Sequence, residues 1–303
     1  MTVLTTNLIP NLIPNSCFMS SDRQSRRLLA TKLGIAGVKN VVLISSAKGG
    51  VGKSSTTIGL GTALKHLYPN LQIGILDADV FGPSIPLMMA LDGQPEVTKR
   101  TAFSKNLMKP LTNFGIKCIS MGFLMEKESA VVWRGLMVMS AIQKLLFGVQ
   151  WGPLDYLLID MPPGTGDTQL SIAQSIPISG AIIVTTPQDI ALMDARRGAT
   201  MFAKTKVPVL GIIQNMSVFV CEKCGHESHI FGQNGAKRLA EELNIDLLGD
   251  IPLDIKMREC CDSGQPIVLT HPTSKCSESL LQIADKLHEK LAKKDLTKNN
   301  LQN

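Results

Sequence analysis

Long hydrophobic runs are absent from this chain of 303 residues, although 44% of the residues are hydrophobic. No apolar run approaches the roughly 18 residues that a membrane-spanning helix needs, so we expect no transmembrane segment. Aromatic residues contribute only 4%, and they are not interleaved with basic residues as in many nucleic-acid-binding surfaces. No internal repeat is evident. The composition therefore predicts one substantial buried core and gives little support to nucleic-acid binding.

Acidic residues are nearly missing from the first 36 positions, where Asp22 is the single acid among many Ser, Thr, Asn and Arg residues. This composition is typical of a mitochondrial transit peptide, although a disordered tail would look similar. Prolines interrupt the apolar start and make it a poor amphipathic helix. We expect residues 1–36 to form a leader, 37–291 one domain, and 292–303 a polar C-terminal tail.

Residues 48–54, Lys-Gly-Gly-Val-Gly-Lys-Ser, form the most informative motif of the sequence. They match a phosphate-binding loop (P-loop), in which backbone N–H groups at the start of a helix surround phosphate oxygens. An apolar strand is predicted before the loop at 41–45, and a helix after it at 54–67, which is the order that the motif requires. Ala47 replaces the usual first glycine, and Lys48 adds a second lysine, so the motif is a deviant Walker A sequence.

Each polar residue of the P-loop has a predicted role. Lys53 is expected to reach the β- and γ-phosphate oxygens, and the Ser54 hydroxyl to hold Mg²⁺. The deviant motif resembles that of P-loop ATPases that work as face-to-face dimers, and this resemblance implies that Lys48 stabilises charge on the nucleotide of a partner subunit. The residues predicted to bind nucleotide in this segment are Gly49, Gly50, Val51, Gly52, Lys53, Ser54 and Ser55.

Strand-like apolar runs alternate with helix-like segments along the chain. This alternation predicts an α/β fold with a mostly parallel, twisted sheet, helices on both faces, and ligand at the carboxyl ends of the strands. The Met-rich segment 136–147 is expected to be a helix of the core. The predicted strands are 41–45, 73–77, 116–121, 156–160, 181–185, 209–214 and 247–251.

Two acidic segments follow predicted strands and supply the carboxylates that phosphoryl transfer needs. Asp79 is expected to orient the attacking water, and Asp77 to support the lysine or the metal. Asp160 ends an apolar run, as in a Walker B motif, and is expected to hold Mg²⁺ through a water molecule. The Pro- and Gly-rich segment 161–167 suits a loop that senses the γ-phosphate.

No Asn-Lys-x-Asp segment, which guanine-specific GTPases usually carry, occurs in the chain. Asn215 closes a predicted strand, and its amide suits N6 and N7 of adenine, although a turn residue is the alternative. Pro252 is expected to lie against the base. ATP is therefore the expected nucleotide.

Cysteine is present at seven positions, which do not form an even disulfide framework. Cys221 and Cys224 form a Cys-x-x-Cys pair that suits a soft metal, but one pair cannot fill a tetrahedral site. Two pairs that converge across a two-fold axis would supply four thiolates for a [4Fe-4S] cluster or a zinc ion. Alternatively, His226 and His229 would complete a zinc site within one chain. A redox disulfide and incidental thiols are further alternatives.

The order of these motifs resembles that of the Mrp/NBP-type P-loop ATPases, above all the mitochondrial branch of that family. The resemblance covers roughly 37–291 and includes 132–137, 186–189 and 249–252. It implies a SIMIBI-type P-loop NTPase fold and a homodimer that binds ATP and Mg²⁺, with slow ATPase activity.

The same resemblance implies that Cys221 and Cys224 hold a [4Fe-4S] cluster between subunits. The cluster would be delivered to apo-proteins, chiefly subunits of respiratory complex I, in the mitochondrial matrix. Cytosolic members often carry an N-terminal four-cysteine motif, whereas only Cys17 precedes the P-loop here.

The alternative function is that of a positioning ATPase of the septum-site or partition type, which acts on a membrane or on DNA with a zinc-binding or incidental cysteine pair. Its support is an apolar stripe with lysines beside it, which suits an anionic membrane surface. Such a stripe is more typical of a helix packed on a sheet, so membrane contact is not favoured. The stripe consists of Leu280, Ile283, Leu287 and Leu291.

Overall fold

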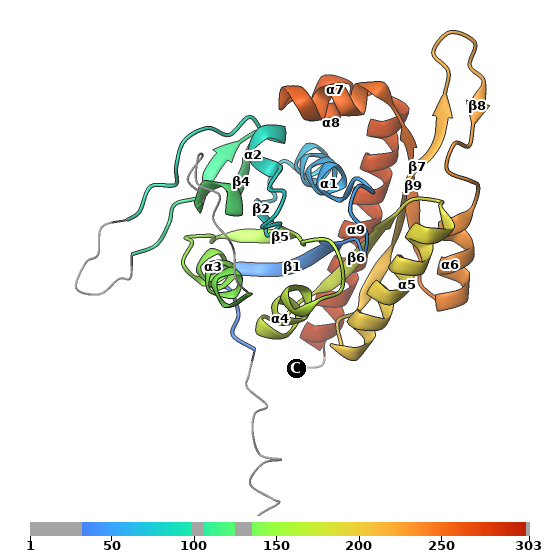
Figure 1. Cartoon of the computed structure of the whole chain (residues 1–303). Helices are drawn as coiled ribbons and strands as arrows, with labels where there is room; N and C mark the ends of the chain where they lie inside the picture. Colours follow the sequence, from blue (N-terminus) through green and yellow to red (C-terminus); the bar gives the residue numbers. More distant parts are fainter. Residues whose placement is uncertain (1–31, 99–105, 125–134, 301–303) are drawn as a thin grey trace, which may run out of the picture. The chain divides into compact units, whose positions relative to one another are not determined.

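The computed structural model describes residues 32–98, 106–124 and 135–300 (Figure 1). The chain divides after Lys32, and the unit described below begins at Leu33. Most of the predicted leader, Cys17 and residues 132–134 of the family resemblance lie outside the described residues. Within the described ranges, no helix is both long and apolar enough to cross a membrane.

A single sheet of nine strands runs through the described part of the chain in the order β3-β4-β2-β5-β1-β6-β7-β8, with β9 paired to β7. β3 and β8 pair antiparallel with their neighbours, and the remaining strand pairs are parallel. The mostly parallel sheet predicted from the sequence is thus confirmed. The strands are β1 Val38–Ser45, β2 Ile73–Asp77, β3 Leu111–Asn113, β4 Ile116–Ser120, β5 Leu154–Asp160, β6 Gly180–Thr185, β7 Val209–Val220, β8 Glu227–Ser228 and β9 Leu247–Leu253.

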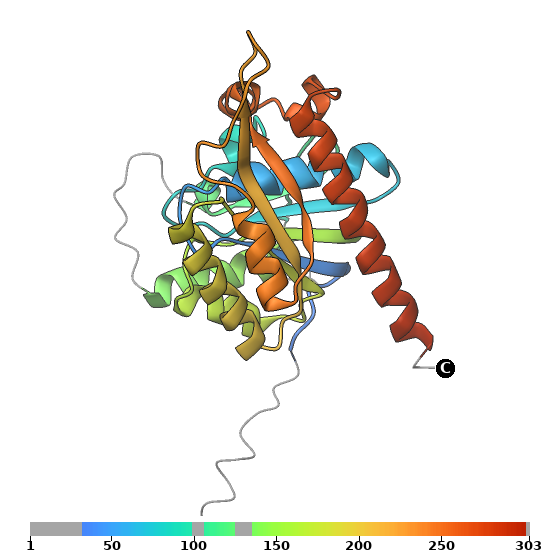
Figure 2. The same cartoon turned by 90° about the vertical axis from the view of Figure 1, so that its right-hand side faces the viewer.

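Helices cover both faces of the sheet, as predicted (Figures 1 and 2). One hydrophobic cluster joins the sheet to α3, α4, α5 and α6, and the other joins it to α1, α2, α7, α8 and α9. The helices are α1 Lys53–Leu67, α2 Ile85–Met88, α3 Gly135–Phe147, α4 Asp167–Ser175, α5 Asp189–Lys204, α6 Gly235–Leu243, α7 Ile255–Ser263, α8 Ile267–Thr270 and α9 Lys275–Asn300, with a 3₁₀ turn at Met121–Leu124.

Strand β1 shows why the central strands are continuous apolar runs. Val41 and Leu43 belong to one hydrophobic cluster, and Val42 and Ile44 belong to the other. Successive side chains of a strand point to opposite faces, so a strand covered by helices on both sides needs an apolar residue at every position.

The C-terminal stripe is buried, which confirms that it packs on the body of the protein. Leu280, Leu287 and Leu291 are 0% exposed and Ile283 is 1% exposed. A Cβ atom on Gly59 of α1 would lie 2.7 Å from the Leu280 methyl groups, so glycine lets α9 approach α1 closely. Helix α9 extends to Asn300 and thus into residues 292–303, which the sequence predicts to be a polar tail.

Strand β7 departs most from the sequence prediction, because it continues well beyond residue 214 and ends at Val220. Met216 has a left-handed φ of +56°, and the pairing with β9 shifts register between Asn215 and Phe219. The polar residues around this irregularity end the apolar run that marks the strand in the sequence. The backbone pairing nevertheless resumes with β8 and β9.

Candidate functional site

The P-loop joins the end of β1 to α1, as predicted. Gly50 and Gly52 have φ angles of +80° and +81°, which glycine adopts without the steric cost of a Cβ atom. A Cβ atom on Gly52 would also lie 2.1 Å from Asn215 Nδ2. Glycine at position 52 is therefore required both by the backbone and by a neighbouring side chain.

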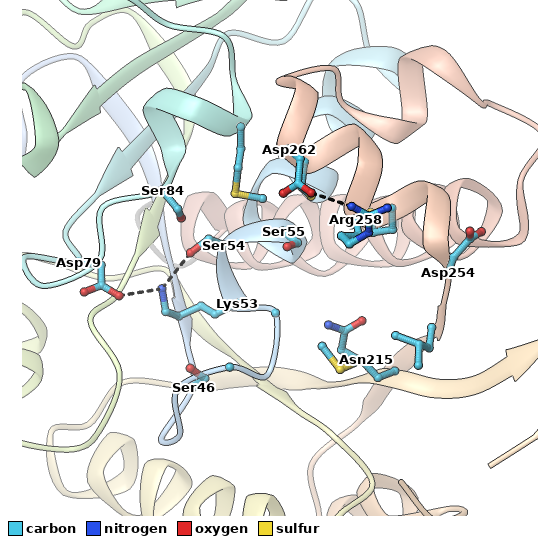
Figure 3. A pocket seen from close by; sticks show the side chains of 18 of the residues that line it. Ser46, Lys53, Ser54, Ser55, Asp79, Ser84, Asn215, Asp254, Arg258 and Asp262 are labelled. Carbon is cyan, nitrogen blue, oxygen red and sulfur yellow. Dashed lines mark hydrogen bonds and ion pairs between the residues drawn. The ribbon is translucent and has the colours of Figure 1, made fainter. Parts of the chain in front are cut away.

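The P-loop forms one wall of a cleft of about 510 Å³ at the carboxyl edge of the sheet (Figure 3). Most of the nucleotide-binding residues predicted from the sequence line this cleft, whereas Val51 is buried and does not. The predicted residues in the lining are Gly49, Gly50, Gly52, Lys53, Ser54, Ser55, Asp79, Asn215 and Pro252.

Asp160 does not itself line the cleft, but it contacts Lys53 and Ser54, which do. Its carboxylate is completely buried, and Oδ2 lies 2.8 Å from Lys53 Nζ. The same oxygen accepts a hydrogen bond of 2.6 Å from Ser54 Oγ, and Oδ1 accepts one of 2.8 Å from Thr57 Oγ1. Lys53 Nζ also lies 3.9 Å from Asp79 Oδ2. The residues assigned to phosphate, metal and water thus lie close together, with Lys53, Ser54 and Asp79 in the wall of the cleft and Asp160 buried beside them.

This donor set fits a magnesium nucleotide. Mg²⁺ prefers hard oxygen ligands, and a hydroxyl and a carboxylate oxygen lie side by side at Ser54 and Asp160. The Lys53 ammonium lies beside them, where it would balance phosphate charge. When bound, the metal would neutralise the negative charge that develops on the phosphate oxygens.

Asp77 is buried under the loop that follows β2. Its carboxylate accepts hydrogen bonds from Ser120 Oγ at 2.8 Å, Asp79 N at 3.1 Å and Ile85 N at 3.3 Å. Burial, followed by the charge of Asp160, raises the pKa of Asp77 to about 7, against the opposing effect of the hydrogen bonds from Ser120 and Asp79 and of the Lys53 charge. Asp77 therefore fixes the loop that carries Asp79, and its predicted support of the lysine is electrostatic.

Asn215 connects β7 to the P-loop. Its Nδ2 donates a hydrogen bond of 2.8 Å to the Val51 carbonyl oxygen. Asn215 and Pro252 both line the cleft, which is compatible with their predicted contact with adenine. That contact stays a prediction. The anchoring of the P-loop is a second role, which only the structure reveals.

Lys48 is partly exposed and does not belong to the residues that line the cleft. Within the described ranges no ion pair holds its ammonium. Its predicted action on the nucleotide of a partner subunit stays a prediction.

Helix α7 adds a wall of the cleft that sequence reasoning missed. Arg258 lines this wall and forms an ion pair of 3.0 Å with Asp262. Asp254 caps the helix, because its Oδ1 accepts a hydrogen bond of 2.8 Å from the N–H of Lys256. In the sequence, Asp254 as a helix N-cap soon after Pro252 was the signal that could have predicted a helix at the cleft. The lining residues of α7 are Met257, Arg258, Cys261 and Asp262.

Cys221 and Cys224 lie in the turn of the β7–β8 hairpin, which projects from the sheet (Figures 1 and 2). They directly follow β7, the strand that carries Asn215; the strand predicted to end at residue 214 continues to Val220. The turn is held by hydrogen bonds from Cys221 N to His226 O at 3.0 Å and from Gly225 N to Cys221 O at 2.8 Å.

The two thiols of the hairpin are accessible: Cys221 is partly exposed and Cys224 is exposed. Hydrogen bonds from the Cys224 and Lys223 N–H groups, followed by one from the Cys224 side chain, lower the pKa of Cys221. A lowered pKa favours the thiolate that binds metal. His229 Nδ1 instead lies 3.2 Å from the Ser217 carbonyl oxygen. No group of three or more potential metal ligands occurs in the described part of the chain.

The strand order, the P-loop between β1 and α1, and the buried acid at the end of β5 together define a P-loop NTPase. Residues 37–288 match the family described as "ParA: NUBPL iron-transfer P-loop NTPase". The chain belongs to this NUBPL family of P-loop NTPases, which confirms the resemblance found in the sequence.

Named relatives extend this match. The "Iron-sulfur cluster transfer protein NUBPL" of Mus musculus is 57% identical over 257 residues, which cover 85% of this chain and 79% of that protein. The "Iron-sulfur protein required for NADH dehydrogenase, mitochondrial" of Arabidopsis thaliana is 50% identical over 254 residues, with coverage of 84% and 79%.

Solved structures confirm the fold. A nucleotide-binding protein of Archaeoglobus fulgidus in complex with ADP has a TM-score of 0.65 and 36% identity, over 76% of this chain and 88% of that one. The cell division ATPase MinD of Pyrococcus furiosus has a TM-score of 0.58 and 21% identity, over 82% and 98%. The second comparison bears on the fold alone.

Proposed function

We propose that this protein is an ATP-binding carrier of iron-sulfur clusters, which holds a [4Fe-4S] cluster between the subunits of a homodimer. The recipients are apo-proteins, in particular subunits of respiratory complex I, in the mitochondrial matrix. The observation that carries this proposal is that one strand, β7, contacts the P-loop at Asn215 and ends in the turn with Cys221 and Cys224. Relatives at 57% and 50% identity are named for cluster transfer and for NADH dehydrogenase.

Mg-ATP would bind in the cleft through residues that already converge there. Ser54 and Asp160 would hold Mg²⁺, the latter through water, and Lys53 would contact the β- and γ-phosphates. Asp79 would orient the water that attacks the γ-phosphorus, and Lys48 would act on the nucleotide of the partner subunit. Catalysis of phosphoryl transfer rests mainly on such positioning and charge, so a slow ATPase is the expected activity.

The cluster would be held by thiolates from two chains. One hairpin supplies two accessible thiols, Cys221 and Cys224, and a [4Fe-4S] cluster takes four. Two-fold symmetry brings the same surface of both subunits together, so two hairpins complete the ligand set. The accessible position of the hairpin turn would let a recipient protein approach the cluster.

Strand β7 would couple the two sites. Asn215 lies at the P-loop and Cys221 follows the end of the strand, at most about 20 Å away at about 3.3 Å per residue. Leu253 and Asp254 line both the nucleotide cleft and a second pocket of about 190 Å³ that Phe219 and Glu222 of the hairpin also line. A change at the P-loop on nucleotide binding would therefore act on the hairpin through shared elements, as in other nucleotide switches.

The stripe that supported a positioning ATPase is not exposed. Its four residues are buried between α9 and the body of the protein. We therefore propose no second function.

Metal analysis after anaerobic purification tests the cluster assignment. We expect about two irons and two sulfides per chain, which corresponds to one [4Fe-4S] cluster per dimer. Cys221→Ser and Cys224→Ser should lose iron and the thiolate-to-iron absorbance, while Cys118→Ala, altered in the remote strand β4, should keep both. Zinc without iron, or full cluster content in the double variant, would refute the proposal. Transfer of the labelled cluster to an apo complex I subunit tests the delivery step.

Import and assembly can be tested separately. Residues 1–36 fused to a reporter should direct it into the matrix of isolated mitochondria and be processed there. Sedimentation of the reconstituted protein should give a dimer that depends on Cys221 and Cys224. A reporter that stays outside mitochondria would remove the localisation without affecting the cluster assignment.

A further inference from the structure

Ser46 carries a buried hydroxyl that no described residue satisfies. The residue is 1% exposed, and its Oγ has no hydrogen-bond partner in the described part of the chain. The Thr186 hydroxyl shares this property. Buried polar groups without partners are rare and unfavourable, so each requires an explanation.

The position of Ser46 explains why its hydroxyl has no partner within the protein. It directly follows the last residue of β1 and lines the nucleotide cleft, whereas Thr186 does not belong to that lining. In Figure 3 its hydroxyl lies on the side of the cleft that holds the Lys53 ammonium and the Asp79 carboxylate, and Asn215 lies farther along the cleft.

The backbone of Ser46 places it at the phosphate end of the cleft. Its carbonyl oxygen accepts a hydrogen bond of 3.1 Å from Gly164 N, in the loop that follows β5. Pro163 of the same loop also lines the cleft. Ser46 therefore lies where the P-loop meets the segment suited to sensing the γ-phosphate.

We propose that Ser46 is a further nucleotide-binding residue, whose hydroxyl donates a hydrogen bond to an oxygen of the γ-phosphate and so distinguishes ATP from ADP. The inference rests on the proposed binding of ATP. A phosphate oxygen is an anionic acceptor, and hydrogen bonds to charged groups are stronger than neutral ones. ADP has no γ-phosphate, so the hydroxyl stays unpaired in the ADP complex.

Substitution of Ser46 by alanine should separate the two nucleotides. The Kd for β,γ-imido-ATP in the presence of Mg²⁺ should rise roughly tenfold, while the Kd for Mg-ADP should change less than about twofold. The melting temperature of the nucleotide-free protein should stay the same or rise, because the variant removes an unsatisfied buried group. A merely structural role of the hydroxyl would lower that melting temperature. Titration calorimetry and thermal unfolding give both readouts.

Two further variants control the experiment. Ser46→Thr keeps the hydroxyl and should keep the preference for the triphosphate. Thr186→Val removes the other unsatisfied hydroxyl, outside the cleft lining, and should change neither Kd.

The outcomes distinguish this inference from the proposed function. Equal weakening of both nucleotides in Ser46→Ala, or no weakening of either, overturns the role of Ser46 and leaves the cluster carrier intact. A wild-type protein that binds neither nucleotide overturns the ATP part of the proposed function together with this inference.

Discussion

Lys53 Nζ lies 2.8 Å from Asp160 Oδ2, and the two side chains are 6% and 0% exposed. Asp160 reaches Lys53 from a strand more than 100 residues away, and the hydroxyls of Ser54 and Thr57 complete its hydrogen bonds. This buried pair joins the start of α1 to the end of β5. It also keeps a lysine, a hydroxyl and a carboxylate together where phosphate and Mg²⁺ would need them.

Lys53→Met should strongly destabilise the nucleotide-free protein. Removing one partner of a buried ion pair leaves an uncompensated charge, here on Asp160, and costs about 3–5 kcal/mol of unfolding free energy. Urea denaturation measures this loss. Lys48→Met is the matched control, because Lys48 is partly exposed and has no ion pair in the described residues. Its unfolding free energy should stay within about 0.5 kcal/mol of the wild-type value, while its ATP turnover falls. Equal unfolding free energies of Lys53→Met and Lys48→Met would contradict the prediction.

Three glycine-to-alanine substitutions in the P-loop should differ in a defined order. Gly49→Ala should be nearly neutral for stability, because a Cβ atom there meets nothing within 4 Å and φ is not positive. Gly50→Ala should cost about 1–2 kcal/mol, because φ is left-handed but space is open. Gly52→Ala should cost more than Gly50→Ala, since its Cβ atom would displace Asn215 from Val51.

Urea denaturation of the three alanine variants provides the measurement. Equal losses for Gly50→Ala and Gly52→Ala would show that the Asn215 contact contributes nothing. Asn215→Ala in the Gly52→Ala background should recover part of the loss, because it removes the steric clash.

The unfolding free energy should carry a pH dependence from Asp77. Its pKa rises from 3.8 to about 7 on folding. Below about pH 4 the carboxyl is protonated in both the folded and the unfolded state. Between about pH 4 and 7 only the folded protein retains the proton, so the unfolding free energy falls as the pH rises. Above about pH 7 this loss is complete. Asp77→Asn removes this titration.

Denaturation of nucleotide-free wild type and Asp77→Asn at about pH 5 and about pH 8 checks this sign. The asparagine has one acceptor oxygen, and its NH2 group would face one of the backbone N–H donors to Asp77, so the variant should be the less stable protein at the lower pH. Its disadvantage should shrink or reverse at the higher pH. A difference that does not change with pH would contradict the raised pKa.

Leu287→Ala should destabilise the protein by about 2–5 kcal/mol, because it opens a cavity in the cluster between α9 and α1. Gln282→Ala, exposed on the same helix, should change the unfolding free energy by less than about 0.5 kcal/mol. Urea denaturation gives both values. If the folded protein bound anionic liposomes and Leu287→Ala abolished that binding, the stripe would instead be a membrane-binding surface.

Bound nucleotide should protect Cys261 from alkylation. Its thiol lines the cleft, and burial raises its pKa against a hydrogen bond from Ser55. Reaction with iodoacetamide should therefore be slow at neutral pH, accelerate at higher pH, and slow again with Mg-ATP. Peptide mass spectrometry of cluster-free protein gives the rate, with exposed Cys224 as the unprotected control. Equal rates with and without nucleotide would exclude α7 from the binding site.

Local motifs could be predicted from the sequence because the residues that form them are contiguous. The P-loop needs only a strand, a glycine-rich turn and a helix in succession, and the strand at 73–77 was predicted with its observed bounds. Strand β7 was predicted too short, because Met216 and its polar neighbours break the apolar pattern while backbone pairing continues. The α7 wall was missed, because one cap, Asp254, is a weak signal without its partners in space.

By itself, the sequence determined the phosphate-binding loop, the alternation of strands and helices, and the thiol pair at 221 and 224. Only the tertiary structure decided which groups meet: Asp160 with Lys53, Asn215 with Val51, and Ser46 with the loop at Gly164. It also decided that the C-terminal stripe is buried and that the thiols lie in a projecting turn. The reason is physical: backbone conformation follows from neighbouring residues, whereas contacts between distant segments depend on strand order and packing.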